Sequence, residues 1–278
     1  MNNRVLLISD LPGYGKVALS AMFPILSKAG LNLFNLPTAL VSNTLDYGKF
    51  EILDTTAYMK NSLAVWDELG FEFDAICVGF IVSEAQTRLV LDFAKKQREK
   101  GVWIFVDPIM GDDGKLYNGI SPQHVGYMRE LCSIADLAVP NLTEATLLAG
   151  LDPETFDMGS DEADRLLRSI TELGAKSVVI TSARVEGQDM VLGYDGQEKT
   201  RFEVPFDYVP VRFPGTGDIF SALVISRALA GARLEEAARF AARVVRELIV
   251  VNRDNADKYA GIPIEKFLEL IYLEKTEN

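Results

Sequence analysis

The chain has 278 residues, of which 28 are Lys or Arg and 40 are Asp or Glu, so its formal net charge is −12. A chain this acidic disfavours binding to nucleic acid or to an anionic membrane. Because 48% of the residues are hydrophobic, we expect one large domain over residues 1–278. The two cysteines, Cys77 and Cys132, are too few and too far apart for a disulfide scaffold or a zinc site. We find no pattern of a signal peptide and no membrane-spanning length, so the expected location is the cytoplasm.

In the first two thirds of the chain, short aliphatic or β-branched runs alternate with longer amphipathic segments. Expected strands cover 5–9, 31–36, 75–79, 102–106, 137–139 and 177–181. Expected helices cover 17–29, 54–69, 85–100, 121–134 and 161–173. Apolar strands separated by helices are typical of a parallel sheet that helices cover on both faces. The pattern therefore predicts a single α/β domain.

The pattern changes after residue 189. Two expected strands, 190–194 and 200–205, flank Asp195-Gly196, which is a hairpin signal. Three helices are expected after them, over 217–230, 234–251 and 263–273. This part of the chain is predicted to add an antiparallel pair and a helical layer.

Short polar side chains stand where several expected strands end. In open parallel sheets, ligands bind outside the carboxyl ends of the strands. Turn formation accounts for one or two such residues, since Asp, Asn and Ser are common in turns. Their number at one edge favours a binding site there. These residues are Ser9, Asp10, Asp107, Asn141, Thr181 and Ser182.

The run from Phe213 to Leu223 is the most informative stretch. Gly215, Thr216 and Gly217 open an apolar segment typical of a buried helix, and Asp218 follows directly. Backbone N–H groups at a helix start lack intrahelical partners, and glycines let a phosphate approach them. Asp218, beside this anion hole, is placed to accept a proton from a hydroxyl group. An acid that only caps the helix is the structural alternative, but the combination suggests a kinase.

Two further segments carry acids near strand ends. Asp107 and Asp112 lie in the tight loop 106–114, and one or two carboxylates together with phosphates and water suit Mg²⁺. An acidic surface turn is the alternative. Asn141 and Glu144 lie three residues apart at an expected helix start, where they either face a ligand or simply cap the helix.

The glycines of residues 13–18 match the dinucleotide fingerprint G-x-G-x-x-A only superficially. Gly13 stands four positions after the last residue of the first strand, and no acid follows the second strand to bind a ribose. The segment is not a P-loop either, since Val17 occupies the Ser/Thr position. We expect this loop to close over a substrate.

Taken together, these motifs resemble the pyridoxal kinases of the ribokinase superfamily, in order from residue 4 to about 250. The resemblance implies a three-layer αβα sandwich with a central, mostly parallel sheet, and a homodimer. It also implies transfer of the γ-phosphoryl group of ATP to the 5′-hydroxyl of pyridoxal, pyridoxine or pyridoxamine, with Mg²⁺ and with room for a monovalent cation such as K⁺. The segments that carry the resemblance are Ser9, 106–108, 111–112, 140–145, 179–182 and 215–218.

The resemblance assigns roles residue by residue. Asp218 is similar to the catalytic base, and Gly215, Thr216 and Gly217 to the anion hole. The remaining roles fall on the residues around them. Those are a metal and phosphate shell of Asp107, Asp112 and Glu144 with Asn141 beside it, a nucleotide contact at Thr181 and Ser182, and a pyridine-ring contact at Ser9.

The departures from the family pattern lie on the acceptor side. Segment 41–45 lacks the family's histidine and has Leu45, and Phe80 stands where a tyrosine is common. We therefore expect an acceptor pocket with Leu45 and Phe80 in its wall that is permissive toward substituents. A hydroxymethylpyrimidine kinase, or another small-alcohol kinase of this fold, is the alternative enzyme. A non-catalytic vitamer-binding protein is the alternative from another class.

Overall fold

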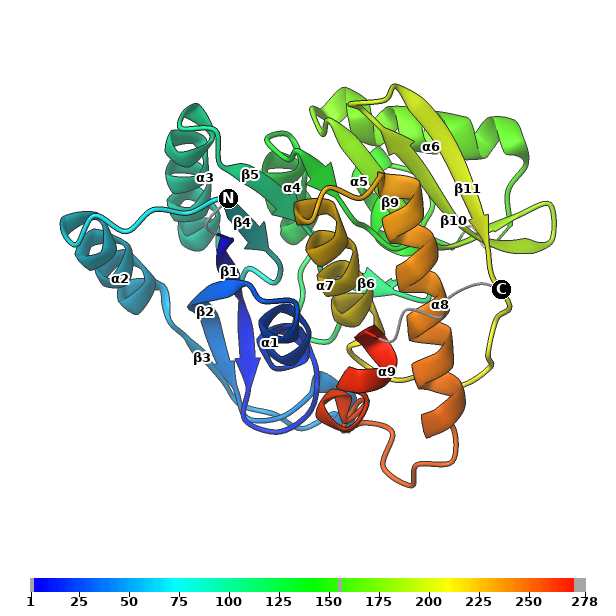
Figure 1. Cartoon of the computed structure of the whole chain (residues 1–278), viewed down its shortest axis with the longest axis horizontal. Coiled ribbons are helices and arrows are strands. Elements are labelled where there is room, and N and C mark those ends of the chain that lie inside the picture. The colour runs from blue at the N-terminus through cyan, green and yellow to red at the C-terminus, as the bar shows by residue number, and fades with distance from the viewer. Residues whose placement is uncertain (1–2, 155–156, 273–278) are drawn as a thin grey trace.

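In the computed structural model, residues 3–154 and 157–272 are described, and they form a twisted sheet between two helical layers (Figure 1). The strand order is β11-β10-β9-β8-β5-β4-β1-β2-β3. The strands are β1 Arg4–Pro12, β2 Asn32–Val41, β3 Ile52–Asp54, β4 Ala75–Val78, β5 Trp103–Val106, β8 Leu137–Ala138, β9 Ser177–Val185, β10 Gln188–Asp195 and β11 Thr200–Pro205. A separate small hairpin pairs β6 Gly111–Asp112 with β7 Lys115–Leu116.

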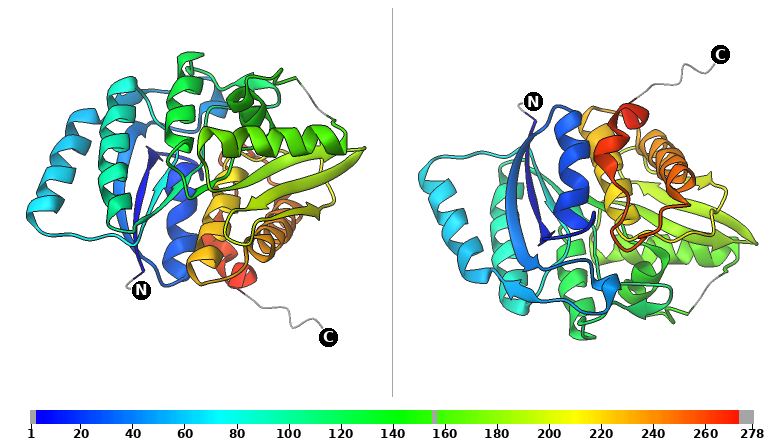
Figure 2. Two further views of the ribbon diagram at one scale, coloured as in Figure 1. Left: turned by 90° about the horizontal axis from the view of Figure 1, so that it is seen from above. Right: turned by 90° about the horizontal axis from the view of Figure 1, so that it is seen from below.

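The helices cover both faces of the sheet because β1 presents alternate residues to each face. Leu6 and Ile8 join the core under one layer, and Val5 and Leu7 join the core under the other. Figure 2 shows the two layers from above and below. One layer has α2 Thr56–Glu68, α3 Glu84–Glu99, α4 Gln123–Cys132, α5 Leu142–Ala149 and α6 Ser160–Leu173, and the other has α1 Ala18–Lys28, α7 Thr216–Leu229, α8 Leu234–Asn252 and α9 Leu268–Tyr272.

The predicted α/β architecture is confirmed. The pairs from β2 through β1, β4, β5 and β8 to β9 are all parallel, whereas β10 and β11 add the antiparallel edge that the Asp195-Gly196 signal predicts. A second hairpin, between β9 and β10, was not predicted. Its turn uses Glu186 and Gly187, both with positive φ, and Glu gives little sequence signal for that conformation.

The expected helix over 263–273 is shorter in the structure. A single 3₁₀ turn covers Ile264–Lys266 and α9 begins only at Leu268, because the backbone of Phe267 leaves the helical region with φ −122°. Residue 273 lies outside the described residues. The three-residue strand β3 was also not predicted, since it is too short to show a period.

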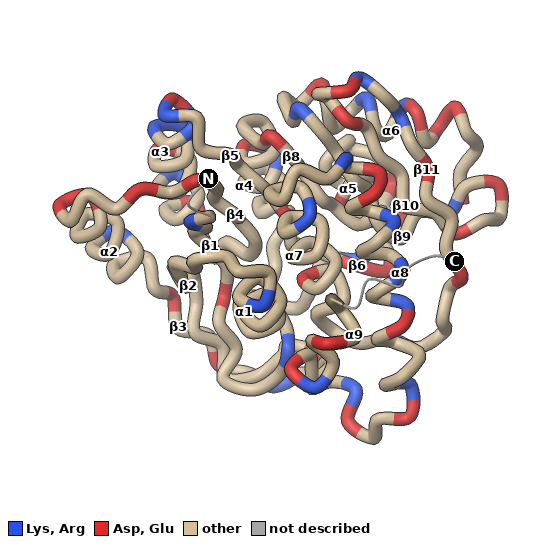
Figure 3. The backbone as a smooth tube through the Cα atoms, in the orientation of Figure 1, with Lys and Arg blue, Asp and Glu red and all other residues tan. Residues whose placement is uncertain are grey.

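Parallel strands bring their carboxyl ends to one edge of the sheet. Asp10 lies near the end of β1, and Asp107 directly follows β5. Thr181 is the middle residue of β9, which continues four residues beyond the predicted strand end at 181. The N-terminus of α7 meets the same edge (Figure 1). Charged residues of both signs are otherwise spread over the peripheral helices and loops (Figure 3). In the described part of the chain, no helix combines the length and hydropathy needed to cross a lipid bilayer.

Candidate functional site

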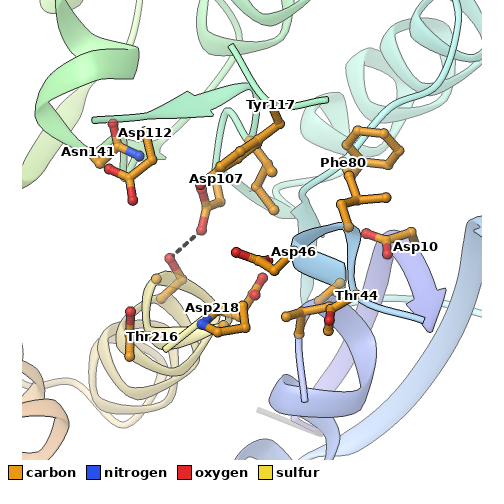
Figure 4. A pocket seen from close by; sticks show the side chains of 18 of the residues that line it. Asp10, Thr44, Asp46, Phe80, Asp107, Asp112, Tyr117, Asn141, Thr216 and Asp218 are labelled. Carbon is orange, nitrogen blue, oxygen red and sulfur yellow. Dashed lines mark hydrogen bonds between the residues drawn. The ribbon is translucent and has the colours of Figure 1, made fainter. Parts of the chain in front are cut away.

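A cavity of about 190 Å³ opens at this edge of the sheet (Figure 4). Every site residue predicted from the sequence lines it, except Ser9. One wall is acidic and polar and comes from β5, α5, β9 and α7. The opposite wall is largely apolar, with Val41, Leu45, Ile52, Phe80 and Ile109.

The N-terminus of α7 forms the floor of the cavity and requires glycine at its first position. Gly215 has φ +85°, and a Cβ there would lie 2.0 Å from the carbonyl oxygen of Lys16. The first intrahelical bond joins Ile219 N to Gly215 O at 3.0 Å. The amides of Thr216 and Gly217 therefore remain available to an anion, whereas the amide of Asp218 donates to its own carboxyl. The helix dipole adds partial positive charge.

Asp218 is held at this helix start by the opposite loop. Burial raises the pKa of its carboxyl to about 6, although the backbone N–H of Ala18 donates to it and offsets part of the shift. Ala18 has φ +47°, a strained conformation for a residue with a Cβ. A carboxylate with this pKa is ionised near neutral pH and remains basic enough to accept a proton from a bound hydroxyl group.

Two more carboxyls face Asp218. Burial and the charge of Asp218 raise the pKa of Asp107 and of Asp10, each to about 7. The Ser221 hydroxyl on α7 donates to Asp107 Oδ2 at 2.7 Å, which fixes one of its two oxygens (Figure 4). Three partly buried acids thus surround one point of the cavity.

Asn141 and Glu144 form a capping box at the start of α5. Asn141 Oδ1 accepts from Glu144 N at 2.9 Å, and Glu144 Oε2 accepts from Asn141 N at 2.9 Å. Glu144 Oε1 accepts from Met110 N at 3.0 Å, and Asn141 Nδ2 donates to Gly111 O at 2.8 Å. The helix-capping alternative is therefore present, and the same contacts tie the 106–114 loop to α5. Burial and the charge of Asp107 raise the pKa of Glu144 well above its ordinary value.

The predicted metal shell is not preassembled. Among the described residues, no three His, Cys, Asp or Glu side chains come close enough together to hold a metal ion. Backbone amides donate to both oxygens of Glu144, so this carboxylate is engaged in the helix cap and the 106–114 loop. Asp107 and Asp112 still face the cavity, and burial together with the charge of Asp113 raises the pKa of Asp112. A pair of carboxylates fits Mg²⁺ that is also bound by phosphates and water.

Thr181 and Ser182 border the cavity where β9 passes the start of α5. Thr181 N donates to Pro140 O at 2.9 Å, and Thr181 forms an isolated bridge with Asn141. Ser182 has φ +55°, in the left-handed region. Strain of this kind at a cavity wall is typical of functional sites.

Ser9 is buried behind the acceptor wall instead of facing the cavity. Its Oγ accepts from Phe80 N at 3.1 Å, and its side chain is 2% exposed. Thr38 Oγ1 donates to Phe80 O at 2.8 Å. Ser9 and Thr38 therefore position Phe80, and the sequence-based expectation that Ser9 faces a ring is not met in this structure.

Several polar residues that line the cavity were not predicted as site residues, among them Thr44, Asp46, Tyr117 and Arg212. The charge of Asp46 acts on Asp112, and the charges of Glu144 and Asp112 act on Tyr117. None of the four belongs to a strand end or a helix start that pointed to the edge of the sheet. The only feature that these residues share in the sequence is a polar side chain in a loop. Most surface loops carry such side chains, so the feature does not indicate a site.

The loop over residues 13–17 reaches the cavity at Val17. Gly13 N donates to Val41 O at 2.6 Å and Lys16 N donates to Ala260 O at 2.9 Å. Val17 and Ala18 line the cavity. The loop is thus fixed between β2 and the C-terminal region.

Comparisons with known proteins agree with this geometry. The family model of phosphomethylpyrimidine kinase matches residues 27–262. The pyridoxine/pyridoxal/pyridoxamine kinase of Bordetella avium is 30% identical over 279 residues and covers 91% of both chains. The pyridoxal kinase of Arabidopsis thaliana is 28% identical over 210 residues, which are 73% of this chain and 66% of that protein. The chain thus spans about two thirds of the plant protein's length.

Solved structures give the same result. A Bacteroides thetaiotaomicron protein assigned as a phosphomethylpyrimidine kinase is 33% identical, covers 99% of this chain and 95% of its own, and has a TM-score of 0.93. A second crystal form of it contains pyridoxal. The Leishmania donovani pyridoxal kinase with ADP and pyridoxine shares the fold at 23% identity and a TM-score of 0.86, covering 98% of this chain and 96% of its own. The chain therefore belongs to the phosphomethylpyrimidine kinase and pyridoxal kinase family of the ribokinase superfamily, whose enzymes phosphorylate an alcohol group.

Proposed function

We propose that this protein transfers the γ-phosphoryl group of ATP to the 5′-hydroxyl of a vitamin B6 vitamer. One observation carries the proposal: Asp218, with its pKa raised to about 6, stands beside the unpaired amides that open α7. A binding protein needs no base at such a position. The pyridoxal-containing Bacteroides structure and the Bordetella kinase support this acceptor class.

In this mechanism the acceptor hydroxyl lies between Asp218 and the terminal phosphate. Asp218 takes the hydroxyl proton as the oxygen attacks phosphorus, and the bond from phosphorus to the β-phosphate oxygen breaks. The amides of Thr216 and Gly217 stabilise the charge on the transferring group. Asp107 and Asp112 would hold Mg²⁺, which neutralises phosphate charge when bound.

The acceptor wall supports a permissive enzyme. Leu45, Ile52 and Phe80 offer shape and stacking without a side-chain hydroxyl, so one polar substituent on the ring changes kcat/KM only by ~10–200-fold. We expect kcat/KM values for pyridoxal, pyridoxine and pyridoxamine within about two decades of one another.

A hydroxymethylpyrimidine acceptor is the second candidate, since the family model that matches residues 27–262 is that of phosphomethylpyrimidine kinase. ADP release with ATP and Mg²⁺ over the three vitamers, hydroxymethylpyrimidine and a simple sugar decides between them. Turnover of the vitamers supports the proposal. Turnover of hydroxymethylpyrimidine alone moves the assignment to the second candidate, and binding of a vitamer without any ADP release refutes both.

We also propose that the protein is a cytoplasmic homodimer, as is usual for members of the family. Light scattering of the purified protein tests the dimer. A molar mass near that of one 30.7 kDa chain would contradict it.

A further inference from the structure

The cavity is strongly unbalanced in charge. Arg212 is the only basic residue among the described residues that line it. The acidic residues there are Asp10, Asp46, Asp107, Asp112, Glu144 and Asp218. Because ATP brings further negative charge, the position of this one guanidinium matters for nucleotide binding.

Arg212 is held only loosely. Its side chain is 56% exposed, and its closest ion pair, Nη1 to Asp46 Oδ1, is 3.7 Å long. No hydrogen bond ties it to any residue that the structure describes. Arg201, by contrast, contacts Asp164 and Glu203 at 2.5 Å each on the outer side of the sheet. The Arg212 guanidinium thus keeps its donors free for a ligand.

Arg212 lines the same cavity as the anion hole. It lies three residues before Gly215, in the loop that leads from β11 into α7, and its charge also acts on Asp112 and Tyr117 across the cavity. A guanidinium presents a planar fork of donors that matches two phosphate oxygens at once.

We propose that Arg212 binds the terminal phosphate of the nucleotide and that Asp46 holds the same guanidinium when no nucleotide is bound. The proposal rests on the function proposed above. Asp46 neighbours Leu45 in the acceptor wall, so this exchange links nucleotide binding to the wall that receives the alcohol.

The test is equilibrium binding of a non-hydrolysable ATP analogue and of ADP, each with Mg²⁺, by calorimetry. Arg212→Gln should raise the Kd of the ATP analogue by about tenfold or more, and the Kd of ADP by less than about threefold. Arg212→Lys should fall between wild type and Arg212→Gln, because it keeps the charge but not the fork. Arg233→Gln is the matched control, since Arg233 is also exposed, pairs loosely with Glu235 and Glu236, and does not line the cavity. Equal loss for both nucleotides, or no loss for either, would overturn the proposal.

Asp46→Asn tests the exchange itself. It should lower the Kd of the ATP analogue in the wild-type background. That gain in affinity should disappear in the Arg212→Gln background. A gain of the same size in both backgrounds would show that Asp46 acts only through its own charge, and would refute the exchange. These readouts need no turnover, so they stay distinct from the panel of acceptors that tests the reaction.

Discussion

The phosphoryl side and the acceptor side of the cavity are built in different ways. On the phosphoryl side, short contiguous segments supply the local geometry, as at Gly215–Asp218 and in the capping box of Asn141 and Glu144. Single backbone amides of Ala18 and Met110 hold these segments in place. On the acceptor side, segments far apart in the chain meet. Thr44 N donates to Tyr14 O at 3.1 Å, and Thr44 Oγ1 donates to Tyr259 O at 2.7 Å.

An exposed aromatic cluster holds these acceptor-side segments together. The rings of Tyr14 and Tyr47 are 6.2 Å apart, those of Tyr47 and Tyr259 are 5.4 Å apart, and Tyr47 Oη donates to Asp257 Oδ2 at 2.5 Å. Such tertiary contacts can differ between relatives while the phosphoryl side stays the same. The phosphoryl side thereby determines the type of reaction, and the acceptor side determines which alcohol is accepted.

The largest effect is expected from Asp218→Asn on the phosphoryl side. Loss of the base should lower kcat by roughly 10²–10⁴ and leave nucleotide binding nearly unchanged, because the helix-start amides remain. Steady-state kinetics and nucleotide titration measure the two effects. A variant with half of the wild-type rate would remove Asp218 from the mechanism.

The pH profile adds a second test of this base. With a pKa of about 6, Asp218 is mostly ionised above that pH, so kcat should rise with pH and level off above about 6. The carboxyls of Asp10 and Asp107, on which the charge of Asp218 acts, each have a pKa of about 7 and broaden the rise toward pH 7. Activity that falls as pH rises from 5 to 7 would contradict this assignment.

Gly215→Ala should disrupt the backbone conformation at the start of α7, on the phosphoryl side of the cavity. The new Cβ would clash with Lys16 O and the positive φ would be strained, so we expect a loss of about 2–4 kcal/mol in the free energy of unfolding, with loss of activity. Gly217→Ala is the matched control, because no heavy atom lies within 4 Å of its Cβ and its φ is not positive. Denaturant unfolding compares them, and equal stability of the two variants would refute the argument.

Ser9→Ala tests the acceptor side. It leaves the amide of Phe80 without its buried partner, so the free energy of unfolding should fall by about 1–3 kcal/mol. The KM for the acceptor should rise for all vitamers alike, since Phe80 shifts and no ring contact is lost. A change for one vitamer only, in the same assay, would place Ser9 at the ring after all.

A further effect concerns the dependence of stability on pH. The pKa of Asp10 is near its usual value in the unfolded chain but about 7 in the fold, so the folded state holds more protons between these values. Stability therefore falls as pH rises from about 4 to about 7 and levels off above. Asp10→Asn removes this dependence and should raise Tm more at pH 8 than at pH 5.5, without metal or nucleotide. An equal shift at both pH values would mean that Asp10 is not perturbed.

The contrast between the two sides also explains what the sequence could predict. Strand periodicity placed Asp107, Asn141 and Thr181 at one sheet edge, and local turn chemistry located the start of α7. Arg212 and Asp46 could not be found this way, because loops carry no period and meet only after folding. The prediction that Ser9 contacts the ring failed for a related reason, since a position near a strand end does not show which way the side chain points.

The lining of the cavity has a consequence for reactive substrates. Among its described residues there is no lysine and no cysteine, and the one basic group is a guanidinium. Lysine amines form imines with aldehydes, whereas a permanently protonated guanidinium does not. Cys77 and Cys132 are buried elsewhere, and burial raises the pKa of both thiols. An aldehyde such as pyridoxal would thus meet no amine or thiol in the cavity lining that could trap it as an imine or a thiohemiacetal.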